Sequence, residues 1–148
     1  MILYYVLIWP LSKLPLSILH GLANGVYFLL YRIFGYRKKV VFDNLSKSFP
    51  DKSSREIKQI ASRFYLHLSD LMVESIKGFS VTEKEILERV KYKNEHIIND
   101  LVDQGRKVIY TAAHYNNWEI AAIATPLALT GKVYAIYFPL KNKALNEK

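Results

Sequence analysis

The sequence predicts an α/β fold: an N-terminal membrane-associated helical segment, then helices and a partial parallel sheet with the order βαβαβ. Two observations predict it. After residue 90, short apolar runs alternate with amphipathic helical patterns, which is typical of parallel strands joined by helices. Near the N-terminus, Leu14–Tyr31 is an uncharged run of 18 residues. We therefore divide the chain into residues 1–36, an apolar membrane-associated segment, and residues 37–148, the N-terminal part of an α/β domain.

The composition excludes several classes of protein. A chain of 148 residues with 51% hydrophobic and 14% aromatic side chains is too apolar to be disordered. The absence of Cys excludes a disulfide scaffold, a zinc finger and cysteine catalysis. The net charge is +8, and residues 32–63 hold nine basic and three acidic side chains directly after the apolar run. Because this basic cluster adjoins a lipid-like segment and no nucleic-acid motif is present, we expect a membrane partner and no nucleic acid.

The apolar run is compatible with three structures. It is shorter than the roughly 20 apolar residues of a full membrane span, and it contains Pro15 and His20. A shallow hairpin or interfacial helix, a true span and a buried helix of a soluble protein all remain open. Aromatic residues flank the run as in an interfacial belt: Tyr4, Tyr5, Trp9, Tyr27, Tyr31 and Tyr36. The basic residues that follow mark a cytoplasmic flank by the positive-inside rule.

Local signals predict four helices in the rest of the chain. Ser53 and Glu56 have capping-box spacing and begin a long helix that Gly78 ends. The apolar residues of this helix recur at helical intervals: Ile57, Ile60, Ala61, Phe64, Leu68, Leu71, Met72 and Ile76. Thr82 and Glu85 form a second capping box, for a short helix. Residues 94–104, with Gly105 as the C-terminal cap, and residues 116–129 complete the set.

Three short runs between these helices predict strands. Residues 107–113 (KVIYTAA) and 132–138 (KVYAIYF) are apolar, β-branched and of strand length, and residues 90–93 are a third candidate. Nearly continuous apolar strands are typical of a parallel sheet that is covered on both faces.

His114 is the candidate catalytic residue because it directly follows the predicted strand 107–113. In open α/β sheets, ligands bind beyond the carboxyl ends of the strands. Glu119 follows five residues later, and two such residues on one helix would lie about 140° apart. If instead His114 lies in the turn and Glu119 in the first helical turn, the carboxylate can orient the imidazole as a general base. His20, His67 and His96 lack metal-ligand spacing, so we expect no metal and no cofactor.

The block His114–Glu119 (HYNNWE) resembles the H-x4-D/E motif of the glycerolipid acyltransferase superfamily. Its ending in Glu is similar to the bacterial lipid A late acyltransferases, the lauroyl and myristoyl transferases. Two further blocks resemble the same branch: residues 37–50, with RKKV, NL and FP, and residues 137–142, YFPLKN. The resemblance covers nearly the whole chain and keeps the order of the blocks.

The resemblance implies a function and a set of site residues. His114 would be the general base on an acceptor hydroxyl, with Glu119 holding the imidazole. The donor would be an acyl carrier protein thioester or acyl-CoA, and the acceptor a lipid A precursor at the cytoplasmic face of the inner membrane. Substrate-binding contacts are expected from five residues: Arg37, Asn116, Asn117, Trp118 and Lys141.

The chain also departs from the family pattern. Phe138 stands where members usually carry a basic residue, and Lys141 is the nearest substitute. Members are also considerably longer, so we expect this chain to be an N-terminal portion of such an enzyme. Two alternatives stay open: a lysophospholipid acyltransferase, or a catalytically inactive, truncated membrane-bound remnant.

Overall fold

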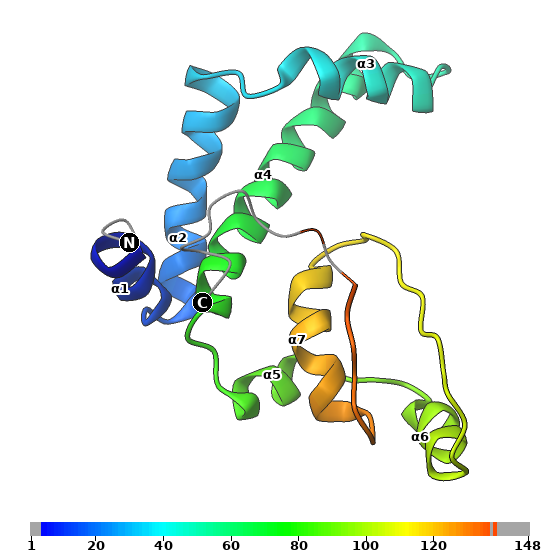
Figure 1. Cartoon of the computed structure of the whole chain (residues 1–148). Coiled ribbons are helices and arrows are strands. Elements are labelled where there is room, and N and C mark those ends of the chain that lie inside the picture. Colours follow the sequence, from blue (N-terminus) through cyan, green and yellow to red (C-terminus); the bar gives the residue numbers. More distant parts are fainter. Residues whose placement is uncertain (1–3, 137, 139–148) are drawn as a thin grey trace. The chain divides into compact units, whose positions relative to one another are not determined.

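The computed structural model describes residues 4–136 and residue 138 (Figure 1). The described elements are helical, in the order η1 (Tyr4–Ile8), α1 (Trp9–Ser12), α2 (Leu16–Tyr27), η2 (Phe28–Ile33), α3 (Lys38–Ser48), α4 (Ser54–Gly78), α5 (Glu83–Arg89), α6 (Glu95–Asp103) and α7 (Trp118–Ala128). The chain divides into two compact units. The first unit is residues 14–77, and the second unit is residues 1–13 together with residues 78–148.

The first unit is built on α4, whose bounds confirm the prediction from its caps. The Ser53 backbone N–H donates to the Glu56 carboxylate at 2.9 Å, and the Glu56 N–H donates back to the Ser53 hydroxyl at 3.3 Å. This reciprocal pair satisfies backbone donors that have no partner within the helix. The helix then runs for 25 residues and ends at Gly78.

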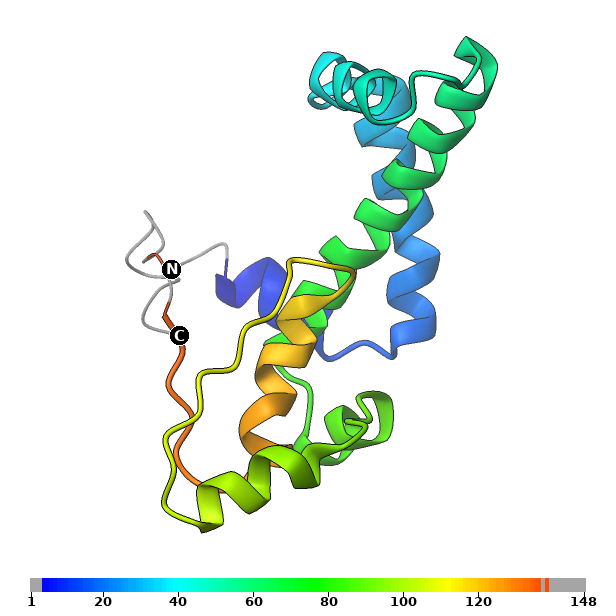
Figure 2. The same cartoon turned by 90° about the vertical axis from the view of Figure 1, so that its right-hand side faces the viewer.

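The buried face of α4 differs from the predicted apolar stripe. Its buried residues recur every fourth position: Ile57, Ala61, Tyr65, Ser69, Val73 and Lys77. Phe64 and Met72, which belong to the predicted stripe, are 43% and 44% exposed. The buried face is the one that meets α2, where Leu19 and Ala23 pack against Val73. Figure 1 and Figure 2 show α2 and α4 running side by side in opposite directions.

A polar contact between α2 and α4 involves His20, which lies within the uncharged run. Its Nδ1 is 3.3 Å from the Asp70 carboxylate, and its Nε2 is 3.4 Å from the Glu74 carboxylate. Asp70 and Glu74 are four residues apart and therefore share a face of α4. Both ring nitrogens can donate to these carboxylates at once only when the imidazole is protonated.

The other face of α2 and η2 leaves apolar side chains exposed: Ile18, Leu22, Phe28, Leu29 and Ile33. The predicted run therefore forms α2 and η2, with one face packed on α4. Among residues 4–136, none of the helices has the length and apolar character needed to cross a bilayer.

In the second unit, α5 packs against α7. The capping box of α5 is confirmed, with the Thr82 hydroxyl accepting from the Glu85 N–H at 3.2 Å. Ile86 of α5 and Ala124 of α7 are fully buried. The N-terminal helices of this unit are held by the ring contact of Tyr4 with Phe79.

The cap of α6 also follows its prediction. Gly105 has a φ of +77°, and its N–H donates to the Val102 carbonyl at 2.8 Å. The Arg106 N–H donates to the Leu101 carbonyl at 3.0 Å. This pair of bonds is the Schellman motif, in which glycine takes the left-handed position without steric cost.

The predicted parallel sheet is wrong. Residues 107–113 and 132–136 are extended, but within the described part of the chain neither segment pairs with another strand, and residues 90–92 form a connection from α5 (Figure 1). Their apolar side chains are exposed, with Ile109 at 89%. An apolar, β-branched run favours an extended backbone, but a sheet also needs non-local ladder partners. In the predicted strand 132–138, Tyr137 lies outside the described residues and Phe138 is exposed.

Candidate active site

The candidate site lies at the N-terminus of α7, in the second unit. Asn117 caps this helix, because its side-chain oxygen accepts a hydrogen bond from the Ile120 N–H at 3.1 Å. Asn116 precedes the cap with a φ of +54°, a left-handed conformation that Asn tolerates better than most residues. The helix begins at Trp118, two residues later than predicted. Asn116 and Asn117 thus have a clear structural role at the turn into α7.

His114 lies in the extended segment that leads into this turn, and it is exposed to solvent. Its ring meets the Trp118 indole edge to face, with centroids 4.4 Å apart and planes at 77°. The N–H of the next residue, Tyr115, donates to the Ala113 carbonyl at 2.8 Å and tightens the chain there. The imidazole is therefore accessible, with one side positioned by Trp118.

Glu119 lies in the first turn of α7 and is also exposed. The N-terminal end of a helix carries a partial positive charge, which stabilises a carboxylate at this position. The order of residues is the one that the prediction requires, because the His precedes the helix and the Glu lies in its first turn. Among the described contacts, the His114 ring meets Trp118, and none joins it to Glu119. A base with an orienting carboxylate can take a proton from a hydroxyl and return it to a leaving group.

Tyr92, which the sequence did not single out, helps to position α7. Its hydroxyl donates to the Ala121 carbonyl at 2.8 Å and lies 2.7 Å from the Thr125 hydroxyl. Both partners are on α7, and Tyr92 is in the connection between α5 and α6. No local pattern predicts this contact, because it joins residues about 30 positions apart.

Of the other predicted site residues, one belongs to the first unit and one lies outside the described residues. Arg37 belongs to the first unit, where it precedes α3 with a φ of +50° and is exposed. Lys141 lies outside the described residues. Phe138, which replaces the expected basic residue, is 97% exposed. Within the described part of the chain, no group of His, Asp and Glu side chains could hold a metal ion.

An exposed imidazole before a capped helix, with a glutamate in the first turn, is an arrangement suited to general-base chemistry on a hydroxyl. Comparison of the chain with known families identifies the class as acyltransferases: residues 1–148 match the family of bacterial lipid A biosynthesis acyltransferases. The chain belongs to this family. No curated protein and no solved structure matches it.

Proposed function

We propose that the protein transfers a fatty acyl chain from an acyl carrier protein thioester to a hydroxyl of a lipid A precursor, with His114 as general base. Membership of the lipid A acyltransferase family supports the reaction class. The observation that carries the residue assignment is the place of His114 before the capped helix α7, whose first turn bears Glu119. Both side chains are exposed and therefore accessible to a lipid and a carrier protein.

In this proposal the His114 imidazole takes the proton of the acceptor hydroxyl while the oxygen attacks the thioester carbonyl. Glu119 accepts a hydrogen bond from the other ring nitrogen and stabilises the charged imidazolium. The tetrahedral intermediate collapses, the carbon–sulfur bond breaks, and the thiol leaves with the proton that His114 returns. The acyl chain passes directly to the acceptor without an acyl-enzyme intermediate.

We further propose that the protein acts at the cytoplasmic face of the inner membrane, with α2 and η2 in contact with lipid. The exposed apolar side chains of these helices, such as Phe28 and Ile33, support this location. Basic residues of α3, such as Lys38 and Lys39, follow directly in the chain and can meet anionic headgroups.

The test is the rate of acyl transfer from an acyl carrier protein thioester by the protein in detergent. His114→Ala should lower the rate by about 10²- to 10⁴-fold, the usual contribution of a general base. His96→Ala is the matched control, because His96 is an exposed histidine of α6 in the same unit. This control should leave the rate unchanged.

Near-normal transfer by His114→Ala would contradict the role of this residue. Supplying a lysophospholipid in place of the lipid A precursor tests the choice of acceptor. A preference for the lysophospholipid would contradict the proposed acceptor. If the unaltered protein transferred an acyl chain to neither acceptor, the proposal that this chain is a catalyst would be contradicted.

A further inference from the structure

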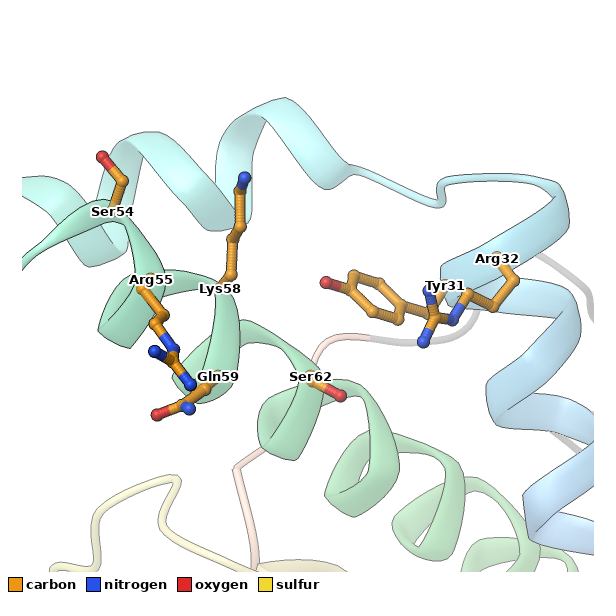
Figure 3. Close-up of a pocket in the computed structure, with 7 residues that line it drawn as sticks. All are labelled: Tyr31, Arg32, Ser54, Arg55, Lys58, Gln59 and Ser62. Atoms are coloured by element: carbon orange, nitrogen blue, oxygen red, sulfur yellow. The ribbon is translucent and has the colours of Figure 1, made fainter.

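The first unit contains an open cavity between η2 and the first half of α4 (Figure 3). Its volume is about 660 Å³. Two side chains come from η2 and the others from α4, and those that matter here are Tyr31, Arg32, Arg55, Lys58, Gln59 and Ser62. Three of these are cationic, and no described residue of the lining is a carboxylate. The charge of the cavity is therefore suited to an anion.

Tyr31 forms a fixed wall of this cavity. This residue is 8% exposed, and its ring stacks on the Tyr65 ring, with centroids 4.8 Å apart. The Lys38 ammonium lies 4.6 Å from the Tyr31 ring centroid, and the Arg32 guanidinium lies 5.5 Å from it. Figure 3 shows Tyr31 pointing from η2 toward α4 with the Arg32 guanidinium close to the ring. Cation–π attraction thus holds Arg32 at the cavity before any ligand binds.

Among the described residues, no ion pair neutralises the cations that line the cavity. In the described part of the first unit, ion pairs join Lys39 to Asp43 and Lys52 to Glu56. None of these four residues lines the cavity. Arg55 and Lys58 are exposed on α4 and carry long side chains that can turn toward a ligand. Three uncompensated positive charges beside hydroxyl and amide donors suit a group with several negative oxygens.

A phosphate monoester has this chemistry, with about two negative charges and three acceptor oxygens. Guanidinium groups bind such oxygens in pairs, and an ammonium adds a point charge. A lipid source is favoured because η2, which bears Tyr31 and Arg32, also exposes Phe28, Leu29 and Ile33. These apolar side chains offer a surface to acyl chains that a soluble phosphate would not use.

We propose that this cavity binds the phosphate monoester group of a lipid, whose acyl chains lie along the exposed apolar side chains of η2. The proposal adds a phosphate-binding site in the first unit, and it rests on the proposed function for the choice of a lipid ligand. It is tested by binding without turnover, so its failure is distinguishable from failure of the acyl-transfer proposal.

The experiment measures binding of the whole chain to phosphatidylcholine vesicles that contain either phosphatidic acid, a monoester, or phosphatidylglycerol, a diester. The unaltered protein should prefer phosphatidic acid by about tenfold, because the monoester offers more charge and more acceptor oxygens. The double variant Arg55→Gln, Lys58→Gln should lose this preference. Its matched control is Arg63→Gln, Lys47→Gln, which removes the same charge from exposed positions of α4 and α3 outside the cavity.

The control should weaken binding to both vesicles alike and keep the preference. Equal loss of preference in both double variants would overturn the proposal, because it would show attraction by surface charge alone. Release from phosphatidic acid vesicles by inorganic phosphate at a concentration no higher than that of the accessible lipid phosphate would overturn the lipid assignment, because the acyl chains would then add nothing to binding. Far-ultraviolet circular dichroism verifies that each variant retains its helices. The conservative variant Arg55→Lys, Lys58→Arg keeps both positive charges and should therefore retain the preference for phosphatidic acid.

Discussion

Glu119 has a structural role at the start of α7 and a proposed role in the reaction. In the first turn of α7 the carboxylate favours helix formation through the helix dipole, and it also lies five residues after His114. Its proposed catalytic role is to orient the imidazole and to stabilise the imidazolium, which matters most in the transition state. Removing such a group is expected to lower the turnover number and to leave the affinity for substrate nearly unchanged.

We therefore expect Glu119→Gln to lower kcat with little change in KM, and by less than the roughly 10²- to 10⁴-fold loss expected for removing the base itself. Steady-state kinetics with an acyl carrier protein thioester measure both constants. Glu95→Gln is the control, since Glu95 occupies the first turn of α6 in the same unit. An equal fall in kcat for the two variants would show that helix stability, and not catalysis, explains the effect.

The environment of Glu56 at the start of α4 makes the stability of the protein depend on pH. Hydrogen bonds from the Ser53 backbone N–H and hydroxyl, with the Lys52 ammonium nearby, hold the pKa of the Glu56 carboxyl below its ordinary value. A lowered folded-state pKa means that the charged form stabilises the fold above the unfolded pKa. This contribution is lost as the pH falls through the folded-state value.

Glu56→Gln should therefore lower the free energy of unfolding at pH 7, and the difference from the unaltered protein should shrink below about pH 4.3, the ordinary Glu pKa. Urea unfolding at a series of pH values measures it. Ser53→Ala removes one of the hydrogen-bond donors and should reduce the same pH dependence. A difference that is constant between pH 7 and pH 3 would exclude the mechanism.

At the scale of whole elements, replacing glycine by alanine should have opposite effects on stability at two positions. Gly131, after α7, has a φ of +82°, and a Cβ there would lie 2.9 Å from Cγ1 of Val102 on α6. Gly21 lies inside α2, where a Cβ would meet no atom within 4 Å. The first glycine serves the turn, while the second only weakens its helix.

Gly131→Ala should destabilise the protein by about 1–2 kcal/mol from the left-handed backbone alone, with a further cost from displacing Val102. Gly21→Ala should stabilise it by about 0.5–1 kcal/mol, because alanine loses less conformational freedom in a helix. Urea denaturation followed by circular dichroism compares the two variants. If Gly131→Ala were as stable as the unaltered protein, the turn would not need a left-handed residue.

For the whole molecule, the main consequence of the structure is an uneven distribution of backbone hydrogen bonds. The helices satisfy their own backbone groups, whereas residues 107–113 and 132–136 are extended and form no ladder within the described part of the chain. Such segments expose their amide groups to water and exchange hydrogen without unfolding of the helices.

Hydrogen–deuterium exchange should therefore be fast throughout residues 107–113 and 132–136 and slow at the buried face of α4, such as Ala61 and Tyr65. Mass spectrometry of peptides from the whole chain measures both regions in one sample. Slow exchange in residues 107–113 would contradict the absence of a ladder and would restore the predicted strand.

The sequence by itself determined the local features of this protein. The starts of α4 and α5 follow from hydrogen bonds across three residues, and the end of α6 follows from a glycine that adopts a positive φ. The block from His114 to Glu119 likewise identified the family and its candidate base. These signals are short-range, so the residue types at neighbouring positions are enough to predict them.

Only the tertiary structure decided the features that depend on residues far apart in the chain. It corrected the sheet, because an extended apolar segment becomes a strand only when a partner accepts its hydrogen bonds. It set which face of α4 is buried, through the contact of Val73 with α2, and it brought the His20 ring to Asp70. Tyr31 and Lys58 line one cavity for the same reason: packing of η2 and α4, and not sequence spacing, determines which side chains meet.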